Sequence, residues 1–510
     1  MEEGLKPDES PLLGDRHCHE QPPPGTASTL QTIGNIIVSI VGTGILGLPF
    51  ALRVAGWLAG SFAIIVAGIS TYYCMILLVQ CRDKMATEEP TTETRTYGDL
   101  GQKALGKTGR YLTESLILVS QCGGAVAYLL FIGQNLSSVF KFNGFTTSTF
   151  IFMLVPIEIA LSWIGSLSAL APFSIFADVC NLLAMAIVVK EDVQKVFGGE
   201  FKFSDRQAIS PGPGGLPFAL GMAVFCFEGF GMTLALEQSM KERGKFRGVL
   251  ANAVAGIASL YIVFGFFGYM AYGDATRDII TLNLTQNWSN IAVQIGMCMG
   301  LVFTFPIMVH PINEIVEGKL RNARWFQKTD NDDDDHRGGY LARWIGRSGM
   351  YLFRAVLIAA LAFLASFVPG FGAFSSIVGS SVCACISFVL PALFHLRLLG
   401  PSLPRWRKVL DCFIMQLKKG VEKQAVMECF GGSYDPNCAE NRPKKKKKIF
   451  DLPDCELGFC CLGFCLVVQM AGLSFPHLEN VRHHLLNLFS NVSNVAFSSC
   501  SVIQLSHFRT

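Results

Sequence analysis

The stretch Val38-Ser-Ile-Val-Gly-Thr-Gly-Ile-Leu-Gly-Leu-Pro49 lies inside the first strongly apolar segment of the chain, and it is a poor sequence for a continuous helix. Each of Gly42, Gly44 and Gly47 costs a helix interior about 1 kcal/mol relative to alanine, and Pro49 has no backbone donor. In lipid an unsatisfied backbone group is costly, so a break persists only where protein buries it or where it lines a water-filled cavity. The stretch therefore predicts a discontinuous membrane helix.

A second apolar segment carries a similar interruption at Phe225-Cys-Phe-Glu-Gly-Phe-Gly231, where the acidic Glu228 stands among aromatic residues and glycines. Interrupted hydrophobic segments at corresponding positions of the two halves of a chain indicate the substrate site of a secondary transporter. We therefore expect a substrate to bind at the two breaks.

The composition is that of a membrane protein. Of the 510 residues, 51% are hydrophobic and 16% are charged, whereas an average soluble domain carries about 25% charged residues. The polar, Pro-rich N-terminal residues lack the charged-then-apolar layout of a cleaved signal peptide, so the first span is expected to stay in the mature protein.

Windows of about 20 apolar residues predict ten membrane-spanning helices. They lie at 32–52, 57–80, 112–139, 149–165, 168–189, 216–236, 249–272, 291–310, 349–368 and 373–395. The connections on the side of the N-terminus hold 19 Lys and Arg residues, and those on the other side hold seven. Because cytosolic connections carry the positive excess, the N-terminus is predicted to be cytosolic.

These spans define an all-α polytopic membrane protein with 10–11 transmembrane helices. A cytosolic tail at 1–31 precedes a ten-helix transporter core at 32–395, and a polar and basic cytosolic segment follows at 396–455. Residues 456–473 form a candidate eleventh membrane segment, and residues 474–510 form an atypical C-terminal tail.

Two loop features bear on topology and metal binding. The triplets Asn283-Leu-Thr and Asn287-Trp-Ser are glycosylation acceptors in a connection expected on the lumenal or extracellular face. The acidic run at 330–336 lacks the glycine and the glutamate that a calcium loop needs in register. No metal and no cofactor are therefore expected.

The first break offers donors for a carboxylate. An unwound helix presents the positive N-terminal end of one half and the free carbonyls of the other. Backbone N–H groups at Thr43, Gly44 and Ile45, beside Gly42, suit the carboxylate of an amino acid. Close packing of small residues remains the alternative for these glycines. A dinucleotide fingerprint is rejected at Gly42–Gly47, because the string sits inside an apolar span with no acidic residue at the required distance.

The second break offers acceptors for an ammonium group, through the carbonyls of Phe225–Glu228 next to Gly229. The rings of Phe225 and Phe227 are expected to line an apolar side-chain pocket, with ordinary core or lipid contact as the alternative. Ionisable residues inside spans are functional by default, so Glu228 and Asp178 are the candidates for proton coupling. Structural hydrogen bonding remains an alternative for Asp178. The chain lacks the zinc-protease, nucleophile-elbow and P-loop motifs, so no enzymatic activity is expected.

The chain resembles the amino acid/auxin permease family, and within it the vacuolar transporters of the AVT type and the proton-coupled amino acid transporters. The residues that carry the resemblance are Asn35–Pro49 with Ala51, Phe225–Gly231, Leu236–Met240, Gly268–Gly273, Ile280–Asn283 and Phe305–Pro311. The resemblance covers roughly residues 27–410.

The resemblance implies an inverted repeat of five plus five helices, with the substrate at the broken first and sixth spans. It also implies proton-linked movement of small, mainly neutral amino acids from vacuole to cytosol. Sodium-coupled relatives carry Asn and Thr at the positions of Val38 and Thr304; only the threonine is present here, which argues against sodium coupling.

The predicted function is therefore secondary active transport of amino acids by alternating access, coupled to protons, in a vacuolar or lysosome-like membrane; the plasma membrane is the alternative location. The expected partners are amino acids, protons and membrane lipid, with no nucleic acid. The alternative function is amino-acid sensing, in which the same site binds its ligand without significant flux.

Overall fold

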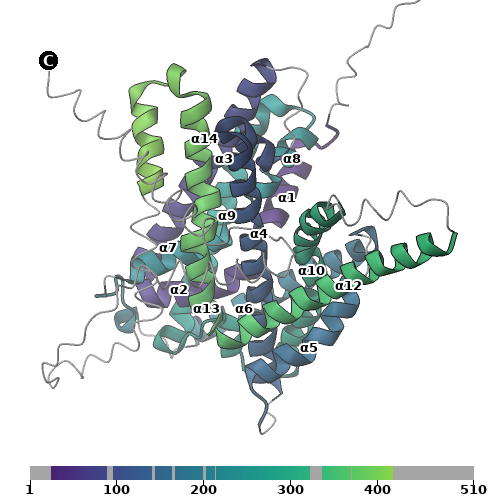
Figure 1. The fold of residues 1–510 in the computed structure, drawn as a ribbon. Coiled ribbons are helices and arrows are strands. Elements are labelled where there is room, and N and C mark those ends of the chain that lie inside the picture. The colour runs from purple at the N-terminus through teal and green to yellow at the C-terminus, as the bar shows by residue number, and fades with distance from the viewer. Residues whose placement is uncertain are drawn as a thin grey trace, which may run out of the picture.

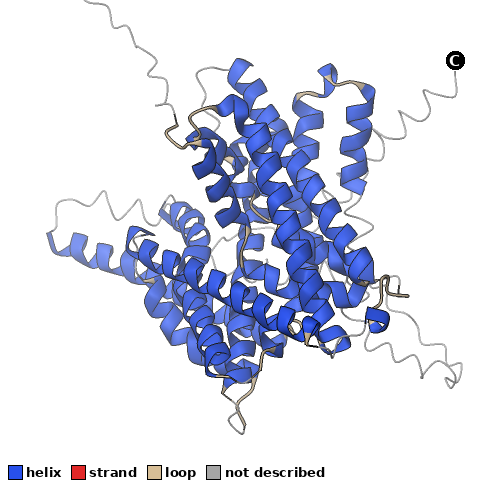
Figure 2. Cartoon of the chain, turned by 180° about the vertical axis from the view of Figure 1, so that it is seen from behind, coloured by secondary structure: helices blue, strands red, loops and turns tan. Residues whose placement is uncertain are grey.

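The structure is a computed structural model and describes residues 25–88, 96–140, 144–163, 167–198, 203–212, 214–285, 287–321, 336–368 and 370–416. The described residues form helices and connecting loops without a named strand (Figure 2). Seven of the described helices are long and apolar enough to cross a membrane, and eight are if the bent first pair counts as one span. The prediction of an all-α polytopic membrane protein is confirmed.

The first predicted span is broken where the glycines stand. It consists of α1 (Thr29–Ile40), the 3₁₀ turn η1 (Thr43–Gly47) and α2 (Leu48–Ala55), and its two parts are bent by 53°. Val41 and Gly42 have extended backbone, which ends α1. Pro49 lies in the first turn of α2, where its missing N–H would have no intrahelical partner anyway.

The sixth predicted span is also interrupted. It consists of α7 (Gly215–Cys226) and α8 (Phe230–Ser239). Phe227 and Gly229 between them leave helical geometry, and Gly229 has φ −174° and ψ 11°.

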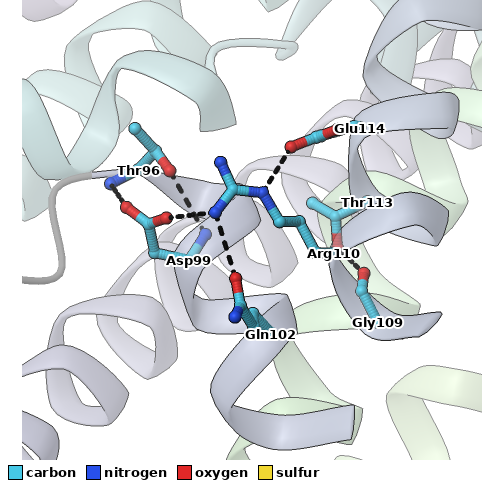
Figure 3. Close-up of polar contacts among 7 residues, drawn as sticks. All are labelled: Thr96, Asp99, Gln102, Gly109, Arg110, Thr113 and Glu114. Carbon is cyan, nitrogen blue, oxygen red and sulfur yellow. Dashed lines mark hydrogen bonds and ion pairs between the residues drawn. The ribbon is translucent and has the colours of Figure 1, made fainter. Parts of the chain in front are cut away.

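The helices between the two broken spans are α3 (Trp57–Glu88), α4 (Tyr97–Val139), α5 (Thr147–Ser162) and α6 (Leu167–Phe197). The first turns of α4 form a separate short helix, because Gly106 has φ 72° and ψ −160°. Arg110 ties this bend together by hydrogen bonds to Asp99, Gln102 and Glu114 of 3.3, 3.0 and 2.7 Å (Figure 3).

The second half contains α9 (Phe246–Tyr272), α10 (Trp288–Arg321) and α12 (His336–Phe367), which runs obliquely beside α5 (Figure 1). The tenth predicted span is less regular than its apolar sequence indicates. It contains α13 (Phe371–Val378), two π-helical turns at Gly379–Cys383 and Cys385–Val389, and α14 (Leu390–Leu398). Widened turns of this kind often occur at functional sites.

Each of the ten predicted spans overlaps described helix. Two of them, α5 with 16 residues and α6, are not among the seven helices that meet the membrane-span test. Residues 405–416, in the segment predicted to be polar and cytosolic, form a helix that packs on the core through the buried residues Asp411 and Ile414. The segments 456–473 and 474–510, residues 1–24 of the N-terminal tail and the acidic run lie outside the described residues. The five-plus-five repeat stays a prediction.

Candidate functional site

The two breaks lie against each other. Gly44 of the first break packs against the end of α7, and Gly229 of the second break packs against the end of α1. A Cβ on Gly44 would lie 3.0 Å from Cys226 Sγ and 3.4 Å from the Phe225 ring. A Cβ on Gly229 would lie 2.9 Å from Cγ1 of Ile40. The structure thus brings together two interruptions whose glycines, Gly44 and Gly229, lie 185 residues apart in the sequence. It also shows Gly44 and Gly229 in close packing contacts.

A single tyrosine joins the ends of the two helices that stop at the breaks. The Tyr261 hydroxyl, on α9, lies 3.3 Å from the carbonyl oxygen of Ile40 and 2.9 Å from that of Cys226. Ile40 ends α1 and Cys226 ends α7. Carbonyls at helix ends have no intrahelical partner, so this fully buried hydroxyl satisfies one of them at a time and holds the two ends at a fixed separation.

The helices that begin at the breaks carry no side-chain caps. The residue before η1 is Gly42 and the residue before α8 is Gly229, and neither has a side chain that could accept a hydrogen bond from the first turn. Both starts therefore present backbone N–H groups and the positive end of a helix dipole at the break. Thr43, Gly44 and Ile45 are buried, whereas Gly42 is exposed and a Cβ there would meet no atom within 4 Å.

Glu228 stands at the second break with a defined hydrogen-bond partner on each oxygen. Ser120 Oγ, from α4, donates to Oε1 at 2.6 Å, and Cys383 Sγ, from the first π-helical turn, donates to Oε2 at 2.9 Å. The carboxyl group is half-buried. A carboxyl group with two donors from two other spans can bind a cation or a proton while its position stays fixed.

The aromatic residues of the second break take different roles. The half-buried Phe225 makes an edge-to-face contact with Phe371, which also contacts Phe131, and a Cβ on Gly47 would lie 3.1 Å from Phe371. The rings of Phe225, Phe371 and Phe131 thus form a chain of contacts beside the first break. Phe227, by contrast, is fully buried, and its ring packs 5.1 Å from that of Tyr261. Its surroundings are those of core packing.

One candidate for proton coupling lies away from the breaks. Asp178 is half-buried on the part of α6 that faces α10, where the adjacent Ala177 lies 2.9 Å from a Cβ placed on Gly300. The structure does not bring Asp178 together with Glu228 by any hydrogen bond found among the described residues. The role of Asp178 in proton coupling stays a prediction.

The predicted glycosylation acceptors lie in the connection between α9 and α10. The side chain of Asn283 donates to the Ala275 carbonyl at 2.8 Å and accepts from the Arg277 N–H at 2.7 Å, so both ends of its amide already have partners. Asn287 is exposed immediately before α10.

Two membrane helices that stop and restart at one place, with their free ends facing each other, are the arrangement of a secondary transporter's substrate site. A family model described as transmembrane amino acid transporter protein matches residues 25–419. The chain belongs to this family, and its resemblance to the amino acid/auxin permeases is confirmed. It is a transporter by family and not an enzyme.

Three relatives show the range of the similarity. Amino acid transporter ANT1 of Arabidopsis thaliana is 62% identical over 388 residues, which cover 76% of this chain and 89% of that protein. Vacuolar amino acid transporter 4 of Saccharomyces cerevisiae is 26% identical over 423 residues, 77% of this chain and 56% of that protein. Proton-coupled amino acid transporter-like protein pathetic of Drosophila melanogaster is 26% identical over 384 residues, 72% of this chain and 76% of that protein.

Three residues of the candidate site were not predicted from the sequence. Ser120 and Tyr261 are polar residues in apolar helices, a pattern too common to single out, and a cysteine in an apolar run, such as Cys383, usually behaves as a small packing residue. In the sequence these three residues share only a polar atom inside an apolar span. Their contacts with Glu228 and with the helix ends, which the structure shows, distinguish them from other polar residues in the spans.

Proposed function

We propose that this protein transports small, mainly neutral amino acids by alternating access, with the substrate bound between the two breaks. The observation that carries the proposal is the meeting of four helix ends at one place, two of them starts without a side-chain cap and two of them ends whose carbonyls face Tyr261. An amino acid carries one charge of each sign. Its carboxylate would bind the N–H groups of Thr43, Gly44 and Ile45, and its ammonium the carbonyl ends and Glu228.

The packing at the breaks favours a small substrate. Gly44 and Gly229 already contact side chains of the opposite break, whereas open space remains beside Gly42. The half-buried ring of Phe225 lies close to this region, because it would contact a Cβ on Gly44, two residues from Gly42. A large side chain on the substrate would have to displace Phe225 or the ring of Phe371 behind it.

A substrate would reach the breaks from the side away from the start of α1 through a polar pocket. Its lining includes Gln134, Ser137 and Ser138 of α4 together with Arg277 and Thr285. Gln134 lies one helical turn beyond Phe131. We infer that the three rings of Phe131, Phe225 and Phe371 separate this pocket from the breaks and act as a closed gate.

We further propose that transport is coupled to protons and runs from vacuole to cytosol, with the N-terminus in the cytosol. The positive excess of Lys and Arg on the N-terminal side supports this orientation. One relative is named as proton-coupled and another as vacuolar. Glu228 is the acidic residue at the breaks and is our candidate for the coupled proton.

The test is uptake of alanine into proteoliposomes in sodium-free buffer, with and without an imposed pH gradient. We expect uptake that rises with the gradient. Uptake that ignores the gradient would contradict proton coupling while leaving amino acid transport intact. Alanine binding to folded protein without any flux would contradict transport and favour the sensing function.

A further inference from the structure

The outer part of α6, on the side away from the start of α1, contains a fully buried acidic residue that the candidate site does not use. Asp192 has no exposed surface, and neither of its carboxylate oxygens has a hydrogen-bond partner among the described residues. A buried ionised carboxylate without a donor is strongly disfavoured, because neither water nor the protein replaces its hydration. The described conformation therefore suits the neutral, protonated carboxyl group.

The position of Asp192 links it to the first broken span. Both Asp192 and Pro49 lie against Gly268 of α9. A Cβ placed on Gly268 would be 3.5 Å from Oδ2 of Asp192 and 2.6 Å from Cγ of Pro49. The carboxyl group thus faces the contact at which the start of α2 presses on the backbone of α9. Pro49 is two residues beyond the end of η1, so a movement of α2 at this contact also moves the substrate break.

The charged and titratable neighbours of Asp192 are few. Glu191 and Lys195 lie on α6 itself, and Tyr272 faces it from α9. On α2 the guanidinium of Arg53 is directed to the carbonyl of Thr276 at 2.9 Å. The other helix packed on α6 is α10, whose residues 288–309 include no Asp, Glu, Lys, Arg or His.

The nearest cation on α6 is held away from the carboxyl group. Lys195 is three residues beyond Asp192 and therefore on the same helix face, but its ammonium lies over the Tyr272 ring, 4.1 Å from the ring centre. We call the contact at which Pro49 of α2 and Asp192 of α6 meet Gly268 of α9 the seam between α2, α6 and α9. When this seam opens, the exposed Lys195 side chain can turn toward Asp192. An ionised Asp192 would then have a partner.

We propose that Asp192 is a proton-binding site of the transporter, which holds a proton in the described conformation and releases it when the seam between α2, α6 and α9 opens. Because the proton binds one conformation better than the other, the pH on this side of the membrane shifts the conformational equilibrium. The proposal rests on the transport function proposed above and adds a second proton site to Glu228.

The first measurement is the infrared difference spectrum of the purified full-length protein between acidic and alkaline buffer. A protonated buried carboxyl group gives a carbonyl band, and we expect part of this band to disappear in Asp192→Asn and to remain in the control Glu191→Gln, the adjacent acid. A band unchanged in Asp192→Asn would overturn the proposal. This readout needs no flux, so it decides the proton site even if the transport function fails.

The second measurement is alanine exchange in vesicles whose inner and outer pH are set separately. One proton changes the conformational equilibrium by at most about tenfold per pH unit, and we expect this response to the pH on the Asp192 side to fall to about onefold in Asp192→Asn. Exchange itself should continue, because asparagine resembles the neutral carboxyl group. A wild-type pH response in Asp192→Asn would contradict the proposal.

A third variant covers the case in which Asp192→Asn does not fold. Lys195→Met leaves the carboxyl group in place and removes the cation that would stabilise its ionised form. We expect the infrared band to persist to higher pH than in the wild type. An unchanged titration of the band would contradict the proposed exchange of partners between Tyr272 and Asp192.

Discussion

The hydroxyl group of Tyr261 is the donor for the carbonyls at the ends of both α1 and α7. Tyr261→Phe keeps the ring on Phe227 and leaves buried carbonyls without a donor, which costs about 1 to 3 kcal/mol of stability. We expect a lower melting temperature and a reduced rate of alanine uptake. The matched control is Tyr351→Phe, whose ring contacts Trp163 on the exposed surface; equal effects of the two variants would contradict the role given to Tyr261.

Glu228 gives a prediction about coupling. Glu228→Gln keeps a side chain of similar shape between Ser120 and Cys383 but removes the proton-binding carboxylate. We expect the pH dependence of alanine uptake to weaken more than the affinity for alanine. Glu242→Gln, at an exposed ion pair with Lys245, is the control. A pH profile identical to that of the wild type would exclude Glu228 as the coupling group.

Substitutions of Gly44 and Gly42 distinguish a loss of packing from a loss of space for the substrate. Gly44→Val should lower both stability and uptake, because the new side chain would overlap Cys226 and Phe225. Gly42→Val should leave the melting temperature close to that of the wild type and still abolish uptake, because it fills open space beside the break. Gly34→Val, in open space on α1, is the control. Normal uptake by Gly42→Val would show that the substrate does not bind in this space.

At the scale of helices, α8 is tied to its neighbours at the end where α1 begins. Arg82 of α3 forms a buried ion pair with Glu237 of α8. In addition, the backbone of Ala27, before α1, exchanges two hydrogen bonds of 3.0 Å with Ser239 and Lys241. The halves of the two broken spans that lie on this side, α1 and α8, are therefore joined directly. We infer that they move together when this side opens.

The ion pair between Arg82 and Glu237 predicts how substitutions at these two residues change the stability of the protein. Arg82→Met removes one partner of a buried pair and should destabilise the protein by about 3 to 5 kcal/mol, because the Glu237 carboxylate is left without its cation. The double variant Arg82→Met with Glu237→Gln should recover much of this loss. The measurement is the melting temperature of the purified protein. Additive effects of the two substitutions would show that the pair does not couple α3 to α8.

At the scale of the whole molecule, the helix at 405–416 completes the assembly beside α14 (Figure 1). Asp411 on this helix has no exposed surface; it accepts a hydrogen bond of 2.7 Å from the Tyr73 hydroxyl and lies 2.7 Å from Nδ1 of His395. Three helices, α3, α14 and the one at 405–416, thus meet at a buried polar cluster. Such a cluster is satisfied only when all three are in place.

Truncations test this cluster. A chain that ends after residue 419, the end of the family match, should reach the membrane and transport alanine. A chain that ends after residue 403 lacks Asp411 and leaves Tyr73 and His395 buried without their partner, so we expect low abundance and no uptake. The measurements are membrane abundance and uptake. Equal behaviour of the two truncated chains would contradict the structural role of the helix.

Much of the fold followed from the sequence, because its signals are local. Apolar windows predicted every described span, and glycines predicted the breaks at Gly42 and Gly229. The π-helical turns at Gly379–Val389 were not predicted, because an apolar run gives no sign of a widened turn. The contact of Phe227 with Tyr261 was not predicted either, since a ring's surroundings depend on which helices stand beside it.

The sequence by itself determined that this protein is a helical membrane transporter with two interrupted spans, because the cost of charge, glycine and proline in a membrane helix acts residue by residue. Tertiary structure alone decided which polar groups meet. Tyr261 reaches two helix ends, Ser120 and Cys383 hold Glu228, and Asp192 is buried without a hydrogen-bond partner in the described part of the chain, each through the packing of distant segments. Such contacts arise only when helices pack, since hydrogen bonds and burial depend on distances in space and not along the chain.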